Sequence, residues 1–175
     1  MHAFEDRFDS VFAVDDNTGM FLHNWVLEHQ PKRILELGTW RGASAIYLAS
    51  ALQAIGAGEL VSVDVQTNRV PMAEQNIASA GLAGFVTLVV MDIDEYLRKQ
   101  NKGKFDLVFM DAEKKQQGQW LEKILSDFLN PKATILVDDA ITMGERMGDL
   151  FALAQERKLK TRMENISDGI YVIAT

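Results

Sequence analysis

Five short runs of apolar, largely β-branched residues recur along the chain, each separated from the next by a longer segment. None of them alternates cleanly between apolar and polar positions, and strands that are buried on both faces have this pattern. The runs therefore predict a parallel sheet in the interior. The predicted strands are residues 33–37, 60–64, 85–90, 105–110 and 133–138.

The segments between these runs have helical patterns. Residues 69–80 have Pro71 near their start and Gly81 directly after their end, where helices favour these two residues. Two later segments place their apolar side chains on one face only, which is typical of a helix that packs on a sheet. The predicted helices are residues 43–54, 69–80, 93–101, 116–129 and 145–157.

The C-terminal part has a different pattern. Residues 158–166 and 168–175 read as two strands joined by a Ser-Asp-Gly turn, which predicts an antiparallel hairpin at the end of an otherwise parallel sheet. Strands that alternate with helices indicate an open α/β fold, in which ligands bind at the carboxyl ends of the strands. The three prolines, at positions 31, 71 and 131, are each expected at the boundary of an element.

Length and composition narrow the class of protein. The 175 residues have the length of one domain, so we expect residues 1–175 to form a single domain. Apolar residues make up 47% of the chain and charged residues 25%, which is ordinary for a globular protein. The net charge of −7 argues against a large nucleic-acid interface, which needs clustered Lys and Arg.

The chain contains no cysteine, which excludes disulfides, thiolate metal sites and a cysteine nucleophile. Its N-terminal residues include acids where a signal peptide would carry a basic segment and an apolar run. No apolar segment approaches the roughly 20 residues that a membrane span requires. We therefore expect a cytoplasmic protein that does not associate with a membrane.

The first predicted strand runs into a glycine turn, "LELGTWRGAS", at residues 35–44. Gly38 and Gly42 bracket the turn, but Trp40 occupies the position where a dinucleotide fingerprint needs a second glycine close to the pyrophosphate. NAD and FAD are therefore disfavoured, and S-adenosylmethionine fits better. Glu36 could hold its ammonium group, directly or through water, and the next helix N-terminus suits its carboxylate. A generic glycine turn is the alternative.

The next two strands also end on acids. Asp64 follows the second strand, where nucleotide-binding α/β folds place the carboxylate that accepts from ribose hydroxyls. Asp92 and the Ile93 backbone follow the third strand and suit the adenine. Each acid has a structural alternative, since Asp64 could stabilise a turn and Asp92 could cap the helix that begins after it. The joint placement at successive strand ends favours a cofactor site.

A second group of charges follows the fourth and fifth strands. Asp111 and Lys114 come after the fourth strand, and Asp138 and Asp139 come after the fifth. If these strands are neighbours, three carboxylates meet, and Mg²⁺ or Ca²⁺ would relieve their repulsion. The alternative is that Asp138 caps the next segment, Asp139 is solvated and Asp111 only touches the cofactor. Glu113 is expected to lie on the solvated surface or at the rim of the pocket.

Four segments, in this order and spacing, resemble the cation-dependent O-methyltransferases, the family of catechol and caffeoyl-CoA O-methyltransferases. They are "LELGTWRGAS", "VSVDV", "FDLVFMDAEK" and "ILVDDA", and residues 17–26 resemble the helix that precedes them in that family. The resemblance covers roughly residues 12–175. It implies a class I S-adenosylmethionine-dependent methyltransferase with a Rossmann-like, seven-stranded, mostly parallel sheet, helices on both faces and a C-terminal antiparallel hairpin.

The resemblance also implies roles for individual residues. Asp111, Asp138 and Asp139 match the metal ligands, and Lys114 matches the general base, which acts beside Asp111. The metal would bind two vicinal oxygens of a small hydroxylated acceptor, and Lys114, with a pKa lowered by the nearby cation, would take the proton. The expected cofactor-binding residues are Val14, Glu36, Gly38, Thr39, Trp40, Gly42, Ser44, Asp64, Val65, Asp92, Ile93 and Asp111.

The chain departs from the family in three respects. Asp139 stands where an asparagine is usual, which adds a negative charge, and Gln117 lies where relatives often carry a tyrosine. The chain also lacks most of the N-terminal helices that cover the acceptor and build dimers in relatives. The sequence is still compatible with a homodimer. We therefore expect an open acceptor pocket, with Trp40 and Met143 as candidate walls.

Three other functions compete with this prediction. A relative that methylates hydroxylated uridine in tRNA would need a basic strip, for which Lys102, Lys104, Lys114 and Lys115 are candidates. A partner subunit that binds S-adenosylmethionine without catalysis would need neither the base nor the metal ligands. A dinucleotide oxidoreductase is disfavoured by Trp40.

Overall fold

The computed structural model describes residues 14–65, 70–99 and 103–175. Its seven strands form one sheet in the order β3-β2-β1-β4-β5-β7-β6. The first five pair in parallel, whereas β7 runs antiparallel to both β5 and β6. The predicted fold class is therefore confirmed. The strands are β1 Arg33–Leu37, β2 Glu59–Asp64, β3 Val86–Val90, β4 Phe105–Met110, β5 Leu129–Val137, β6 Lys160–Glu164 and β7 Ile170–Ala174.

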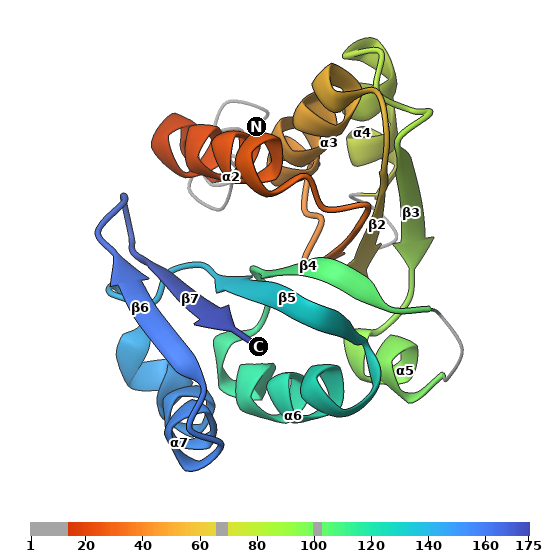
Figure 1. Ribbon diagram of the computed structural model, residues 1–175. Coiled ribbons are helices and arrows are strands. Elements are labelled where there is room, and N and C mark those ends of the chain that lie inside the picture. Colours follow the sequence, from red (N-terminus) through yellow and green to blue (C-terminus); the bar gives the residue numbers. More distant parts are fainter. Residues whose placement is uncertain (1–13, 66–69, 100–102) are drawn as a thin grey trace, which may run out of the picture.

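Helices cover both faces of this sheet, with α2, α3 and α4 on one face and α5, α6 and α7 on the other (Figure 1). The helices are α2 Asp16–His29, α3 Ala43–Ile55, α4 Val70–Ser79, α5 Ile93–Arg98, α6 Gln117–Asp127 and α7 Gly148–Glu156, with 3₁₀ turns η1 Lys114–Gln116 and η2 Gly144–Met147. Two hydrophobic cores result, one on each face. Leu35 and Leu37 belong to one core and Ile34 to the other, because successive side chains of a strand point to opposite faces.

Several element boundaries differ from the prediction, and two of these differences bear on β5 and α5. Pro131 lies inside β5, because this strand begins at Leu129, which pairs with Phe105, and not at residue 133. The pairing shifts register between Phe105 and Leu107, and such an irregularity tolerates a proline that cannot donate a hydrogen bond. Helix α5 ends at Arg98, and the last two residues of the predicted helix 93–101 lie outside the described residues.

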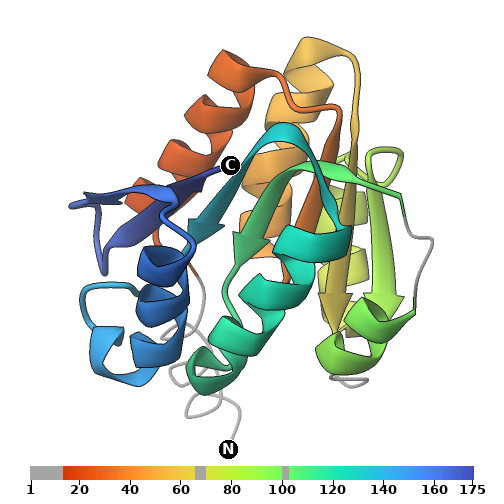
Figure 2. The same cartoon turned by 60° about the horizontal axis from the view of Figure 1, so that its bottom comes forward.

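The five parallel strands end at one edge of the sheet, which we call the carboxyl edge; their arrowheads point downwards in Figure 2. We call the opposite edge, where these strands begin, the amino edge. The strand order confirms that β4 lies between β1 and β5, so the glycine turn after β1 and the acids after β4 and β5 meet at the carboxyl edge. None of the described helices combines the length and the apolar character needed to cross a membrane.

Candidate functional site

The pairing of β4 with β5 brings the predicted acids together. Met110 is in register with Val137, so Asp111 and Asp138 follow side by side, and the Asp138 amide donates to the Met110 carbonyl at 3.1 Å. Asp139 has a φ of 62°, a left-handed conformation that aspartate and asparagine tolerate better than most residues. We refer to Asp111, Asp138 and Asp139 as the acid cluster.

Lys114 lies between two members of this cluster. Its Nζ atom is 2.7 Å from Asp111 Oδ1 and 2.7 Å from Asp139 Oδ2. Only 10% of the Lys114 side chain is exposed, so the two ion pairs are largely shielded from water. The lysine that was predicted to be a base is therefore bound as a counter-ion in this structure.

The pKa values in the cluster reflect burial and charge together. Burial alone would lower the pKa of Lys114, but the charges of Asp111 and Asp139 and their hydrogen bonds raise it above its usual value. Burial raises the pKa of Asp138 to about 8, and the charges of Asp111 and Asp139 add to this effect. Lys114 is thus held as an ammonium ion, and its pKa is shifted opposite to the direction expected for a base.

The cluster contains the oxygen donors that a hard divalent cation prefers. Among the described residues, however, no group of three or more His, Cys, Asp and Glu side chains is arranged to hold a metal ion. One ammonium group pairs with two of the three carboxylates, and Asp138 accepts from the Asp139 amide at 2.9 Å. The carboxylate oxygens are the donor type that a divalent cation prefers, but they are not arranged around a metal position while Lys114 occupies two of the carboxylates.

Gly38 joins the glycine turn to the acid cluster. Its φ is +108°, and a Cβ atom at this position would lie 2.3 Å from the Asp111 carbonyl oxygen. Only glycine allows so close an approach in this conformation. Because the Asp111 amide also donates to the Leu37 carbonyl, at 2.9 Å, the ends of β1 and β4 are fixed against each other.

Asp64 is bound to the same turn. Its Oδ2 atom accepts from the amides of Thr39, at 3.1 Å, and Trp40, at 2.9 Å. Trp40 has a φ of 49° and is half-buried. Asp64 therefore stabilises the glycine turn, which is the alternative to ribose binding that the sequence left open. It also lies at the carboxyl end of β2, where the ribose acceptor was predicted.

Glu36 lies in the interior and not in the cleft. It is fully buried, and its two carboxylate oxygens accept from the hydroxyls of Ser44 and Ser62. The Ser62 hydroxyl also lies 2.5 Å from that of Thr39. Burial raises the pKa of Glu36 to about 7, against the opposing effect of the serine hydrogen bonds. Direct contact between Glu36 and a ligand ammonium would require these hydrogen bonds to break. Glu36 therefore affects the glycine turn only indirectly, by fixing the positions of Ser44 and Ser62.

Sequence reasoning missed Ser62, which is fully buried in the middle of β2. The available signal was a polar residue in the otherwise apolar run "LVSV", since a buried hydroxyl needs a partner. No side chain of the described part of the chain caps the amides at the start of α3, whose N-cap is Gly42 with a φ of 84°.

The other predicted cofactor residues lie at or near the same edge. Asp92 caps α5, with Oδ1 accepting from the Glu95 amide at 3.0 Å, so its structural alternative is also realised. Ile93 is buried beneath it, whereas Val65 is 55% exposed directly after Asp64. Val14, the first described residue, packs against the core on the α2, α3 and α4 face.

Both candidate walls of the acceptor pocket, Trp40 and Met143, are at least partly exposed. Met143 is 39% exposed, and its amide donates to the Asp139 carbonyl at 2.8 Å, so it lies close to the acid cluster. Gln117 is fully buried and donates to the Ala112 carbonyl at 3.4 Å. Its Oε1 atom has no hydrogen-bond partner among the described residues.

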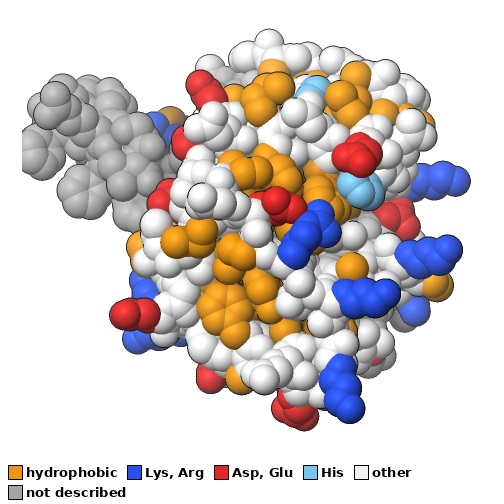
Figure 3. All heavy atoms as spheres, turned by 60° about the vertical axis from the view of Figure 1, so that its left-hand side comes forward, with side chains coloured by type: hydrophobic (Ala, Val, Ile, Leu, Met, Phe, Trp, Pro, Cys, Tyr) orange, Lys and Arg blue, Asp and Glu red, His pale blue; other side chains and the backbone are white. Residues whose placement is uncertain are grey.

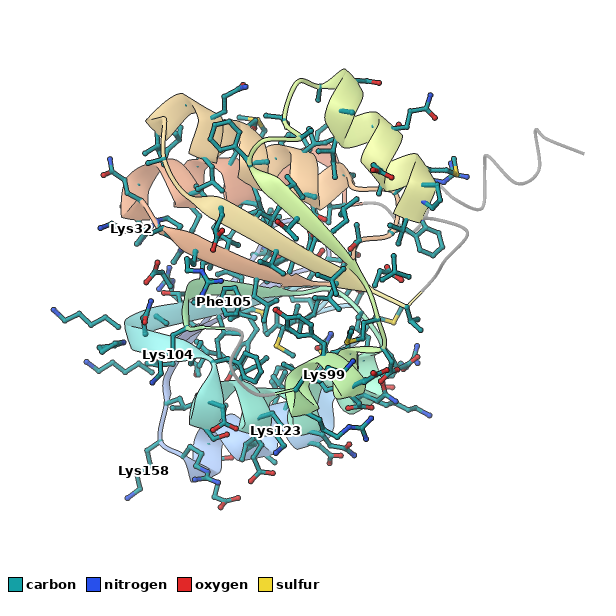
Figure 4. The ribbon with its side chains drawn as sticks, turned by 90° about the vertical axis from the view of Figure 1, so that its right-hand side faces the viewer. Lys32, Lys99, Lys104, Phe105, Lys123 and Lys158 are labelled. Atoms are coloured by element: carbon teal, nitrogen blue, oxygen red, sulfur yellow. The ribbon has the colours of Figure 1, made fainter. Side chains whose placement is uncertain are left out.

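The lysines proposed for a tRNA-binding strip do not form one. Lys104 precedes β4 at the amino edge, whereas Lys114 and Lys115 follow the same strand at the carboxyl edge. Lys114 is also paired with two acids, and Lys102 lies outside the described residues. Lys32, Lys104 and Lys158 instead lie along the amino edge (Figure 4). In Figure 3, Lys and Arg side chains lie along the right-hand side of the view, and others adjoin the hydrophobic side chains near its centre.

Residues 35–140, which contain the glycine turn and the acid cluster, match a family described as a methyltransferase domain. A catechol O-methyltransferase from Niastella koreensis is 32% identical over 138 residues, which are 77% of this chain and 61% of that protein. A catechol O-methyltransferase from Mycobacterium tuberculosis is 32% identical over 156 residues, which are 87% of this chain and 70% of that protein. The chain thus spans less than two thirds of the Niastella protein.

Solved structures agree with these similarities. The O-methyltransferase TomG from Streptomyces achromogenes, in complex with S-adenosylmethionine, has a TM-score of 0.78 and 25% identity, covering 94% of this chain and 82% of that one. An O-methyltransferase from Bacillus cereus, in complex with S-adenosylhomocysteine, has a TM-score of 0.81 and 21% identity, covering 97% and 88%. The second similarity shows the fold alone.

Proposed function

The chain belongs to the methyltransferase-domain family, and from this premise we propose that it transfers the methyl group of S-adenosylmethionine to a hydroxyl of a small, catechol-like acceptor in a divalent-cation-dependent reaction. One observation supports this proposal above the others. The glycine turn after β1 lies against Asp111, the first residue of the acid cluster. A Cβ atom added to Gly38 would be only 2.3 Å from the Asp111 carbonyl oxygen. A methyl donor on the turn and an acceptor at the cluster would therefore be neighbours.

The proposed donor site uses the carboxyl ends of β1, β2 and β3. The uncapped amides at the start of α3 suit the carboxylate of the donor's methionine part. Asp64 would accept from the ribose hydroxyls, and Asp92 and Ile93 would lie beside the adenine. Glu36 would not contact the donor; its hydrogen bonds with Ser44 and Ser62 would stabilise the conformation of the glycine turn.

Asp111, Asp138 and Asp139 would hold the divalent cation, which we propose to be Mg²⁺ or Ca²⁺. When bound, the cation would polarise the acceptor hydroxyl and favour its ionised form. Lys114 is the proposed proton acceptor. As the acceptor oxygen bonds to the methyl carbon, the carbon–sulfur bond of the donor breaks and its electron pair stays on sulfur. The hydroxyl proton passes to the Nζ atom of Lys114, which must first have given its own ammonium proton to solvent.

Calorimetric titration tests the binding part of the proposal. The protein is titrated with S-adenosylmethionine and with NAD, each with and without MgCl₂. We expect heat of binding for S-adenosylmethionine only, because Trp40 stands where a pyrophosphate would need a glycine. Binding of NAD, or no binding of S-adenosylmethionine, would contradict the proposal.

An activity assay tests the reaction. We expect transfer of a labelled methyl group from S-adenosylmethionine to catechol in MgCl₂ and its loss in EDTA, with recovery when MgCl₂ is restored. Unchanged activity in EDTA would show that the cation assignment is wrong while the methyl transfer stands. Methylation of tRNA, together with a salt-dependent shift of its mobility, would instead favour the tRNA alternative.

The cytoplasmic location, the organisation of residues 1–175 as a single domain and a homodimer stay predictions. A homodimer would affect the acceptor pocket, because a second copy of the chain could supply one of its walls. Size-exclusion chromatography with light scattering would measure the oligomeric state directly.

A further inference from the structure

Lys114 forms the ion pairs that a bound cation would be expected to form. Its ammonium group lies 2.7 Å from one oxygen of Asp111 and 2.7 Å from one oxygen of Asp139. These two carboxylates come from different strand ends, so the lysine bridges the loop after β4 and the turn after β5. The side chains are 10% exposed for Lys114, 19% for Asp111 and 28% for Asp139, so solvent screens the contacts only in part.

Two cations are not easily accommodated by the same carboxylates. A metal ion and an ammonium group bonded to one carboxylate oxygen lie within about 5 Å of each other. Their repulsion is strong where water is largely excluded. Among the described residues, only Lys114 is paired with this cluster, so it is the group that a metal would have to displace.

We propose that Lys114 and the divalent cation compete for Asp111 and Asp139, so that binding of the cation releases the lysine side chain. This inference rests on the proposed cation-dependent function. It assigns Lys114 two states. Without the cation, Lys114 offsets part of the negative charge of the acid cluster and keeps the site assembled; with the cation, its side chain leaves Asp111 and Asp139.

The local structure allows the side chain to move without the backbone. Lys114 begins the short turn η1, which is anchored independently at Glu113, because Glu113 Oε1 pairs with Arg146 at 2.8 Å and accepts from the Lys115 amide at 3.4 Å. Neither contact involves the Lys114 side chain. The four-carbon stem of a lysine has several rotamers of similar energy, so its head can leave the carboxylates while η1 stays in place.

Asp139 should strengthen the competition, because its carboxylate offers Lys114 a charged oxygen where an asparagine would offer a neutral one. Aspartate at this position adds a second ionic contact to the one from Asp111. The extra negative charge thus binds the lysine in the absence of metal and becomes available to the metal once the lysine leaves.

The matched pair Lys114 and Lys115 provides the test. Both carry one positive charge in η1, but Lys114 is buried against the cluster and Lys115 is exposed. MgCl₂ is titrated by calorimetry into the wild type and into Lys114→Met, Lys114→Gln and Lys115→Met. We expect both Lys114 variants to bind Mg²⁺ about tenfold more tightly than the wild type, and Lys115→Met to differ by less than about twofold. Lys114→Gln keeps an N–H donor for the cluster and serves as the variant less prone to misfolding.

A second measurement uses the wild-type protein alone. Acetic anhydride labels lysine amines, and mass spectrometry reports the labelling of each lysine with and without MgCl₂. We expect labelling of Lys114 to rise when Mg²⁺ is added, while labelling of Lys115 stays constant as the internal control.

The outcomes separate the two proposals. If the wild type binds Mg²⁺ and the Lys114 variants bind it equally or more weakly, or if labelling of Lys114 does not rise, the competition is wrong and the cation-dependent function stands. If only the Lys114 variants bind Mg²⁺, the competition holds and the cation dependence of the natural protein fails. If no form binds Mg²⁺, both fail.

Discussion

The acids of the site at the carboxyl edge and three lysines at the amino edge lie in different surroundings. At the carboxyl edge, the acids of the site are largely buried and tied to one another, as in the pairing of Lys114 with Asp111 and Asp139. At the amino edge, Lys32, Lys104 and Lys158 are exposed (Figure 4), and within the part of the chain that the structure describes none of these three forms an ion pair.

This difference shows that the surroundings of a charge, and not the charge itself, decide its effect. An exposed charge is screened and its removal has little consequence, whereas a shielded charge with a partner affects stability, binding and pKa. Substitutions at the two edges should therefore differ by orders of magnitude. Four substitutions test this, from the largest expected effect to the smallest.

Asp111→Ala should lower methyl transfer by about 10³-fold or more, because it removes a proposed cation ligand and one of the two partners that position Lys114. Steady-state kinetics with catechol and MgCl₂ measure the loss. Glu113→Ala is the matched control, since Glu113 lies two residues away, is exposed and pairs only with Arg146 among the printed ion pairs. Equal losses in both variants would show that the acid cluster has no special role.

Gly38→Ala should destabilise the fold by roughly 3–5 kcal/mol, because its Cβ atom would clash with the Asp111 carbonyl at 2.3 Å in a left-handed conformation. Gly56 has a similar φ of +77° but nothing within 4 Å of an added Cβ atom. Gly56→Ala should therefore cost only about 1 kcal/mol, the price of the conformation alone. Urea denaturation measures both, and similar values would contradict a close contact at the carboxyl edge.

Glu36→Gln should remove a pH dependence. Burial raises the pKa of Glu36 from 4.5 to about 7 in the folded protein, so its contribution is fully present below pH 4.5 and is lost as the pH rises towards 7. Relative to Glu36→Gln, the wild type should lose about 3 kcal/mol of stability across this window. The other acids are common to both proteins, so urea denaturation at pH 5 and pH 7.5 isolates the difference. A constant difference would show that Glu36 is not protonated in the fold.

Lys104→Ala should change stability by less than about 0.5 kcal/mol and leave methyl transfer unchanged, since this lysine is exposed at the amino edge. Thermal unfolding and the same kinetic assay check both points. A clear loss of activity would contradict the division between the two edges and would point to a role of the amino edge in substrate binding.

Much of the fold could be predicted from the sequence because it depends on local patterns. Apolar runs without alternation gave the parallel strands, and the Ser-Asp-Gly turn gave the C-terminal hairpin, as the structure confirms. The error at Pro131 arose because the start of β5 depends on pairing with Phe105, which no local signal contains. The predicted helix 145–157 likewise included most of the 3₁₀ turn η2.

The candidate site was predicted in part. Acids at the ends of β4 and β5 had to meet once those strands were neighbours, and they do. The sequence could not foresee that both oxygens of Glu36 are taken by Ser44 and Ser62, because this depends on how α3 packs against β2. It also predicted a lowered pKa for Lys114 beside a cation, whereas the two carboxylates around it raise that pKa in this structure.

The sequence by itself determined which residues end the strands, since the pattern of buried strands and their turns is written in neighbouring positions. It thereby determined the glycine turn, the acids at the carboxyl edge and the family to which the chain belongs. Only the tertiary structure decided how these groups pair. Lys114 joins Asp111 and Asp139, which are 28 positions apart along the chain, because electrostatic attraction depends on distance in space and on the exclusion of water, and neither is set by spacing in the sequence.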